Sequence, residues 1–261
     1  MTTINLWNSE NSVKMHCYEP KIKHGNGAVI IFTGGGYSHR AAHEAEPYAL
    51  KLNEMGIWAF VVDYSVSPFG HPMQLGQARR AVSLVRYNAE KFGIDPNKIA
   101  VMGSSAGGHL AALCSTSKER FVHIKPDDID LTDHRPNAQI LCYPVTDEQS
   151  HGGSYENLIG KKKFREYKSK EVDPILLADE NTPPAFIWHT SSDDVVDVTG
   201  TYRYATRLSE LGVPVEMHIY PIGCHGLGLA TGDPKREPVE YVQRWIEDLK
   251  RWLKLMGWIN E

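Results

Sequence analysis

Short apolar runs alternate along the chain with segments in which apolar residues recur every three or four positions. The runs predict strands, and the run at residues 57–63 is nearly continuous, as in a strand buried on both faces of a sheet. Strands are predicted at residues 13–18, 28–32, 57–63, 98–102, 138–143, 185–189 and 215–220. Helices are predicted at residues 44–55, 75–93, 201–211 and 239–256, with another directly after residue 105.

The order of these elements predicts the fold class. Strands that alternate with helices are joined by βαβ crossovers, which give a mostly parallel central sheet with helices on both faces. A chain of 261 residues, 41% of them hydrophobic, is long enough to bury one sizeable core. We therefore expect a single α/β domain over residues 1–261.

Residues 146–184 interrupt this alternation. The segment is long, polar and rich in Lys, Tyr and Ser, and it follows a strand that is predicted to end at the C-terminal edge of the sheet. Connections of this length usually carry function or are disordered. We expect the segment to form a small cap insertion over a site at that edge.

The strand at residues 98–102 leads into Gly103-Ser104-Ser105-Ala106-Gly107, which is a G-x-S-x-G pattern between a strand and a helix. So tight a turn strains its central residue, and the residues two before and two after it must be small to let strand and helix approach. The serine hydroxyl then projects beside the amides at the helix N-terminus. A plain Gly/Ser turn is the alternative, but the flanking strand and helix favour Ser105 as a nucleophile.

A serine hydroxyl needs a base that accepts its proton, and a turn of this type is followed along the chain by an acid and then by a histidine. His225 follows the strand at residues 215–220 and lies in the sequence Gly-Cys-His-Gly. His109 is the competing candidate. It lies only four residues after Ser105, and we expect it to pack against neighbouring loops.

The acid is expected in the loop after the strand at residues 185–189. Asp193, Asp194 and Asp197 all lie there, and spacing alone does not choose between them. Each of them could instead cap a loop or carry a surface charge. In this hypothesis Ser105 attacks an ester carbonyl, His225 acts as general base and then general acid, and the carboxylate fixes the imidazole tautomer.

A tetrahedral intermediate also needs amide donors for its oxyanion. The amide of Ala106 is one candidate donor, and the glycine run at residues 34–36 after a predicted strand offers another. A glycine-rich loop after a strand could instead bind phosphate, but this one lacks both the G-x-G-x-x-G pattern and a Walker lysine. The hypothesis requires no cofactor and no metal.

The charge and composition exclude several other classes of function. A net charge of −4 gives no electrostatic case for nucleic acid or an anionic membrane as a partner. The N-terminal residues lack the basic and apolar regions of a signal peptide, and no segment approaches the roughly 18 apolar residues of a membrane span. We therefore expect a cytoplasmic protein. The four cysteines are scattered and contain no C-x-x-C pair, so neither a zinc site nor a disulfide framework is indicated.

Several motifs together resemble an α/β-hydrolase family, namely the one that contains acetylxylan esterases and small carboxylesterases similar to the BD-FAE-like esterases. The resemblance extends from residue 28 to the end of the chain. It rests on Thr-Gly-Gly-Gly-Tyr at 33–37, Glu-Pro at 46–47, Val-Asp-Tyr at 62–64, the serine turn and helix at 103–112, Gly-Ser-Tyr-Glu-Asn-Leu-Ile-Gly at 153–160, Trp-His-Thr at 188–190 and Cys-His-Gly-Leu-Gly-Leu-Ala at 224–230. It implies the α/β-hydrolase fold.

The resemblance also implies roles for individual residues. In that family the acid lies four residues after the histidine of the Trp-His-Thr strand end, which selects Asp193 over its neighbours. The family's histidine falls on His225, and its oxyanion glycines fall on Gly35 and Gly36. The chain departs from the family pattern at Asp197, where a proline is common, and at Cys224, where a glycine usually precedes the histidine. Neither change removes a catalytic group.

The implied function is the hydrolysis of short acyl esters by a cofactor-free serine carboxylesterase. Acetylated xylo-oligosaccharides or other acetylated sugars are the natural substrate candidates. Tyr37 and Tyr155 are expected to contact substrate, and Asn157 and Tyr167 in the insertion also suit a carbohydrate. The same fold could serve an arylformamidase or a general detoxifying esterase, and a non-catalytic binding protein is a remote alternative. The sequence is compatible with a homo-oligomer.

Overall fold

The computed structural model describes residues 1–8, 12–118, 127–160, 169–234 and 236–260. Within these residues, eight strands form one sheet in the order β1-β2-β4-β3-β5-β6-β7-β8. The pairs β1–β2 and β2–β4 are antiparallel, and every other pair is parallel, so the predicted mostly parallel sheet is confirmed. The strands are β1 (Thr2–Asn5), β2 (Lys14–Tyr18), β3 (Ala28–Phe32), β4 (Trp58–Val62), β5 (Ile99–Ser104), β6 (Ala138–Cys142), β7 (Ala185–Thr190) and β8 (Val215–Tyr220).

The apolar runs of the sequence form the centre of the sheet. Strands β3 to β7 are buried along their whole length, as continuous apolar runs predict. Strand β8 is half-buried because it lies at one edge of the sheet and has a neighbour on one side only. Strand β1 lies at the other edge, and the sequence analysis missed it because its four residues are short of apolar side chains.

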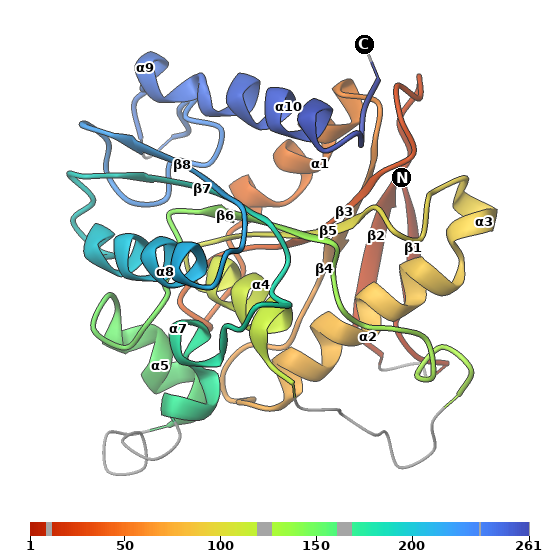
Figure 1. The fold of residues 1–261 in the computed structure, drawn as a ribbon, viewed down its shortest axis with the longest axis horizontal. Coiled ribbons are helices and arrows are strands. Elements are labelled where there is room, and N and C mark those ends of the chain that lie inside the picture. The colour runs from red at the N-terminus through yellow and green to blue at the C-terminus, as the bar shows by residue number, and fades with distance from the viewer. Residues whose placement is uncertain (9–11, 119–126, 161–168, 235, 261) are drawn as a thin grey trace.

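Helices cover both faces of the sheet, as predicted. Figure 1 shows α1 and α10 on one face and α2, α4 and α8 on the other. Each face has its own apolar core, with Leu52 and Trp245 in one and Leu110 and Leu208 in the other. The helical segments are η1 (Ala42–Glu44), α1 (Glu46–Glu54), α2 (Met73–Tyr87), α3 (Ala89–Phe92), α4 (Ala106–Thr116), α5 (Gly152–Ile159), η2 (Ser169–Val172), α7 (Pro174–Leu177), α8 (Val198–Glu210), α9 (Glu240–Gln243) and α10 (Trp245–Leu255).

Two of the predicted helices are each divided in the structure. The helix predicted at residues 75–93 consists of α2 and α3, which meet at Asn88. The Asn88 side-chain amide donates to the carbonyl oxygen of Leu84 at 2.9 Å, and such a local hydrogen bond competes with the helical pattern. The C-terminal helix is likewise divided into α9 and α10 at Arg244.

The described parts of residues 146–184 form α5, η2 and α7. Helix α7 packs against α4 and α8 on one face of the sheet. Helix α5 reaches the loop after β3, where Asn157 Nδ2 donates to the carbonyl oxygen of Gly36 at 2.8 Å. The insertion therefore adjoins the C-terminal edge of the sheet, and its action as a cap stays a prediction. No described helix combines the length and the apolar character that crossing a lipid bilayer requires.

Candidate active site

The predicted sharp turn lies between β5 and α4, with Ser105 at its centre. Ser105 has φ 53° and ψ −121°, which is a strained conformation for a residue with a side chain. The two flanking glycines are required by close approach, because a Cβ at Gly103 would overlap the carbonyl of Gly107 and one at Gly107 would overlap the carbonyl of Phe32. The strain and the small neighbours therefore fix the serine side chain at the end of β5.

Three side chains from three strand ends form one hydrogen-bonded chain. Ser105 follows β5, Asp193 follows β7 and His225 follows β8. His225 Nε2 lies 2.9 Å from Ser105 Oγ, and His225 Nδ1 lies 2.7 Å from Asp193 Oδ2. Because a carboxylate only accepts hydrogen bonds, Nδ1 of His225 carries the proton, and Nε2 is free to accept the serine proton. The structure thus brings together the three residues that the sequence predicted.

Asp193 is held as a carboxylate despite its burial. Its side chain is fully buried, which by itself would raise the pKa, but hydrogen bonds from His189 and His225 lower the pKa well below its usual value. The backbone amides of Val195 and Val196 also donate to Oδ1, at 2.9 and 2.8 Å. Asp193 therefore remains negatively charged at every pH at which the protein is expected to work.

The competing candidates do not contact the His225 imidazole. The carboxylate of Asp194 accepts only the backbone amide of His225, at 3.4 Å, and that of Asp197 caps α8 by accepting the Thr199 amide. The ring of His109 donates from Nε2 to the carbonyl oxygen of Val172 at 2.8 Å. The geometry therefore agrees with the choice of Asp193 and His225.

Tyr37 and Tyr155, which the sequence analysis expected to contact substrate, are buried with exposures of 0% and 1%. The Tyr37 hydroxyl donates to His109 Nδ1 at 2.7 Å, and the Tyr155 hydroxyl is 3.3 Å from the carbonyl oxygen of Val172. Both rings pack edge-on against the His109 ring. Direct substrate contact by these tyrosines finds no support here, since they form a buried layer below the surface. Tyr167 lies outside the described residues.

The glycine loop after β3 lies against the serine. A Cβ at Gly34 would be 3.1 Å from the Cβ of Ser105, which places the loop in contact with the turn. Gly35 and Gly36 have φ angles of 120° and 61°, which glycine adopts most readily. The amide of Ala106 begins α4, where the first amides of a helix have no intrahelical acceptor. The candidate oxyanion donors therefore come from two segments that adjoin Ser105.

A buried carboxylate that the sequence analysis missed supports these loops. Glu44 is 2% exposed, and its Oε2 accepts the Gly34 amide at 2.6 Å while its Oε1 accepts the Tyr143 hydroxyl at 2.7 Å. The Tyr143 oxygen in turn accepts the Gly228 amide at 2.9 Å. Burial and the charge of Glu44 raise the pKa of Tyr143, which keeps its hydroxyl protonated and able to donate. Glu44 thereby links the glycine loop after β3 to the loop that carries His225.

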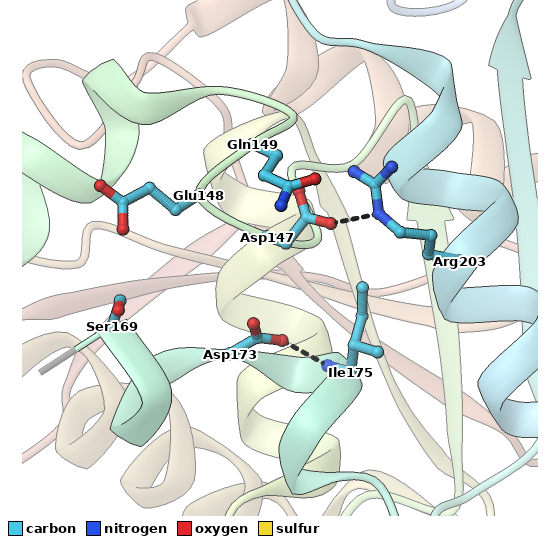
Figure 2. Close-up of a pocket in the computed structure, with 7 residues that line it drawn as sticks. All are labelled: Asp147, Glu148, Gln149, Ser169, Asp173, Ile175 and Arg203. Atoms are coloured by element: carbon cyan, nitrogen blue, oxygen red, sulfur yellow. Dashed lines mark hydrogen bonds and ion pairs between the residues drawn. The ribbon is translucent and has the colours of Figure 1, made fainter. Parts of the chain in front are cut away.

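A polar cavity lies beside the turn that follows β6. Its volume is about 490 Å³, and Figure 2 shows the ion pair of Asp147 and Arg203 on one side with Asp173 facing it. Asp147 Oδ2 accepts from Arg203 Nε at 2.7 Å, and burial raises the pKa of Asp173. The lining residues are Asp147, Glu148, Gln149, Ser169, Asp173, Ile175 and Arg203.

His151 connects this cavity to the proposed triad. It ends the turn that contributes Asp147, Glu148 and Gln149 to the cavity, and it caps α5 by accepting the Ser154 amide. Burial lowers the pKa of His151, and the nearby charge of His225 lowers it further. His151 thus lies two residues after the cavity-lining Gln149 and interacts electrostatically with His225. Within the described ranges, no cluster of three or more His, Cys, Asp or Glu side chains could hold a metal ion.

Comparison with known proteins agrees with this geometry. A family model described as BD-FAE matches residues 15–208. The endo-1,4-beta-xylanase B of Butyrivibrio fibrisolvens is 35% identical over 216 residues, which are 78% of this chain and 33% of that protein. The acetylxylan esterase of Xylanibacter ruminicola is 32% identical over 259 residues, which are 97% of this chain and 50% of that protein. The chain thus spans a third to a half of the length of these curated relatives.

The solved structures include a relative of nearly the same length. The acetyl ester-xyloside bifunctional hydrolase from Caldicellulosiruptor lactoaceticus is 38% identical and superposes with a TM-score of 0.90. The match covers 99% of this chain and 97% of that one. The resemblance drawn from the sequence motifs is confirmed by these comparisons: the chain belongs to the BD-FAE family of α/β-hydrolases.

Proposed function

We propose that this protein is a serine carboxylesterase that hydrolyses short acyl esters by means of Ser105, His225 and Asp193. The observation that carries the proposal is the continuous hydrogen-bonded chain from Ser105 Oγ through both nitrogens of His225 to Asp193 Oδ2. A strained serine between a strand and a helix, with a base and a buried acid in line behind it, is the arrangement that acyl transfer requires.

Each residue has a defined step in the reaction. Ser105 Oγ bonds to the ester carbonyl carbon while His225 Nε2 accepts the serine proton. The imidazolium that forms is stabilised by the Asp193 carboxylate. The alcohol leaves with the proton from Nε2, and an acyl group remains on Ser105. A water molecule then gives a proton to His225 Nε2 and attacks the acyl carbon, and Nε2 returns that proton to Ser105 Oγ as the bond to the acyl group breaks, which releases the carboxylic acid and the free serine.

The carbonyl oxygen becomes negatively charged in both halves of the reaction. We assign its stabilisation to the amides of Ala106, Gly35 and Gly36. Removing one oxyanion donor in a serine hydrolase costs on the order of 10² to 10³ in kcat. The contact between Gly34 and Ser105 supports this assignment, because it brings the glycine loop against the serine.

We further propose that the substrates are acetylated xylo-oligosaccharides or related acetylated sugars. One relative is named an acetylxylan esterase and another an acetyl ester-xyloside bifunctional hydrolase, which supports this substrate class. The polar cavity lined by the turn after β6 supports it as well, because carboxylate, amide and guanidinium groups are suited to hydrogen bonding with sugar hydroxyls.

The substrate assignment is tested by acetate release from acetylated xylo-oligosaccharides, measured beside p-nitrophenyl acetate, butyrate and octanoate. Ser105→Ala serves as the blank, and Ser104→Ala is the matched control because it removes a hydroxyl one residue away. We expect acetate release from the oligosaccharides and a steep fall in kcat/KM beyond the acetate ester. If only the nitrophenyl esters are hydrolysed, the assignment as a serine hydrolase stands and the sugar substrate is rejected.

A further inference from the structure

Asp193 accepts hydrogen bonds from two imidazoles. Besides His225, the ring of His189 lies with its Nε2 at 3.1 Å from the same oxygen, Oδ2. His189 is the penultimate residue of β7 and has an exposure of 0%. Its other nitrogen, Nδ1, is 2.8 Å from the Thr201 hydroxyl on α8. A linear set of contacts therefore runs from Thr201 through His189, Asp193 and His225 to Ser105.

The direction of each hydrogen bond follows from the groups involved. The Asp193 carboxylate only accepts, so Nε2 of His189 must carry a proton. In the neutral ring, Nδ1 is then an acceptor, and the Thr201 hydroxyl is placed to donate to it. Thr201 thus selects the His189 tautomer that donates to Asp193, in the same way that Asp193 selects the tautomer of His225.

We propose that His189 and Thr201 extend the proposed triad outward and set how much of the Asp193 negative charge is available to His225. The inference rests on the proposed function, because it concerns the base of that reaction. His189 has no contact with the serine, so it acts as a positioning residue. It holds the carboxylate in place and partly offsets its negative charge. Asp193 therefore stabilises the protonated form of His225 less strongly.

The physical effect has a definite sign. A donor on a carboxylate stabilises the negative charge and reduces the stabilisation that the same charge offers to a neighbouring cation. Without the His189 donor, Asp193 stabilises the imidazolium form of His225 more strongly. The acid limb of the kcat/KM profile, which reports the protonation of His225, then moves to higher pH.

Other groups also face His225, and all of them stay in place when His189 is replaced. Asp194 accepts its backbone amide, Arg236 donates to its carbonyl oxygen, and the Tyr143 ring packs edge-on at 5.2 Å. His151 interacts with it electrostatically. Within the part of the chain that the structure describes, none of these four residues hydrogen-bonds to His189, so a shift of the acid limb isolates the effect of His189.

The test is the pH dependence of kcat/KM on p-nitrophenyl acetate for His189→Leu and His189→Gln. Leucine removes the donor with a similar volume, and we expect the acid limb to move upward by about half a unit to one unit. Glutamine retains an amide donor, and its acid limb should lie closer to that of the unmodified protein. Titration with a fluorophosphonate normalises each rate to the concentration of reactive serine.

A second pair of variants covers the case in which His189→Leu does not fold. Thr201→Val removes the hydroxyl that polarises the His189 ring, and we expect a smaller shift in the same direction. Tyr204→Phe is the matched control, since it removes another buried hydroxyl of α8, one that bonds to Gln139 at 2.9 Å outside the chain of contacts.

We expect Tyr204→Phe to lower thermal stability without moving the acid limb. The inference is overturned if the acid limb of the kcat/KM profile lies at the same pH in Thr201→Val as in the unmodified protein, and also in His189→Leu where that variant folds. His189 would then contribute only to packing. The proposed function fails by a different result, namely the absence of Ser105-dependent hydrolysis in the unmodified protein.

Discussion

The carboxylate of Glu44 and the hydroxyl of Tyr143 are 2.7 Å apart, which joins the end of η1 to the residue that follows β6. The other oxygen of Glu44 holds the Gly34 amide, and the Tyr143 oxygen holds the Gly228 amide. One buried carboxylate therefore connects the loop that we assign to the oxyanion with the loop that carries His225.

Glu44→Gln should impair both folding and activity. A glutamine side chain has a single acceptor oxygen, so either the Gly34 amide or the Tyr143 hydroxyl loses its partner. An unsatisfied buried donor costs about 1–3 kcal/mol, and we expect the free energy of unfolding in urea to fall by that amount. We also expect kcat to fall about tenfold or more as the oxyanion loop loses its anchor.

Glu54→Gln is the control for Glu44→Gln, because Glu54 ends the neighbouring helix α1 with its side chain 66% exposed. Both quantities should change little in this variant. A Glu44→Gln protein that loses stability but retains full kcat would mean that the carboxylate supports the fold without positioning the active-site loops.

Asn157→Asp tests the contact between the insertion and the glycine loop. Aspartate has the shape of asparagine but cannot donate to the carbonyl oxygen of Gly36, so the substitution removes that hydrogen bond and places two acceptors together. We expect kcat to fall about tenfold while the KM for p-nitrophenyl acetate changes less, because the loop is assigned to the transition state. Asn181→Asp in an exposed loop is the control. If Asn157→Asp and Asn181→Asp have the same kcat and KM, the contact between α5 and the glycine loop does not contribute to catalysis.

His109 should make the protein sensitive to acid. Burial lowers the pKa of His109 to about 4, whereas a histidine in the unfolded chain has a pKa of about 6.5. Because the folded-state pKa is depressed, the stability is fully present above pH 6.5 and is lost as the pH falls toward 4, where only the unfolded chain takes up the proton. Between pH 7 and pH 5 this amounts to about 2 kcal/mol.

Urea unfolding of His109→Gln at pH 7 and pH 5 checks this prediction. A glutamine can still donate to the Val172 carbonyl and accept from the Tyr37 hydroxyl, but it does not titrate. We expect the stability difference between the two pH values to shrink by about 2 kcal/mol in this variant and to persist in His24→Gln at an exposed position. The same difference in all three proteins would refute the prediction.

The polar cavity leads to a prediction about where the sugar part of the substrate binds. If Asp173 contacts the sugar of an acetylated xylo-oligosaccharide, Asp173→Asn should raise KM for the oligosaccharide by severalfold more than KM for p-nitrophenyl acetate. Asparagine can still cap α7, because its side-chain oxygen can accept the Ile175 amide as Asp173 does. An equal effect on both substrates would place sugar binding elsewhere.

The sequence predicted those site residues that are tied to local motifs. Ser105, Asp193 and His225 each follow an apolar strand, and parallel strands bring their carboxyl ends to one edge of the sheet. No role was predicted for Glu44, and His189 served only to locate the acid, because nothing in the local sequence says that a charged or ionisable side chain points inward. The expected substrate contacts of Tyr37 and Tyr155 found no support for the same reason, since burial of a loop tyrosine depends on what packs over it.

The elements that were missed or divided have a similar explanation. Strand β1 has Ile4 as its single apolar residue, and its pairing with β2 fixes it at the edge of the sheet. The break at Asn88 depends on one side-chain hydrogen bond that overrides an otherwise helical pattern. Periodicity reports which faces are apolar, but local hydrogen bonds decide where such a segment ends.

The most direct test of the central claim is the mass of the intact protein after reaction with a fluorophosphonate, followed by peptide mapping. We expect one adduct per chain, located on Ser105. The adduct should be absent in Ser105→Ala, with kcat reduced on the order of 10⁴, and retained in Ser104→Ala. An adduct on another residue, or a Ser105→Ala protein that keeps its activity, would contradict the account.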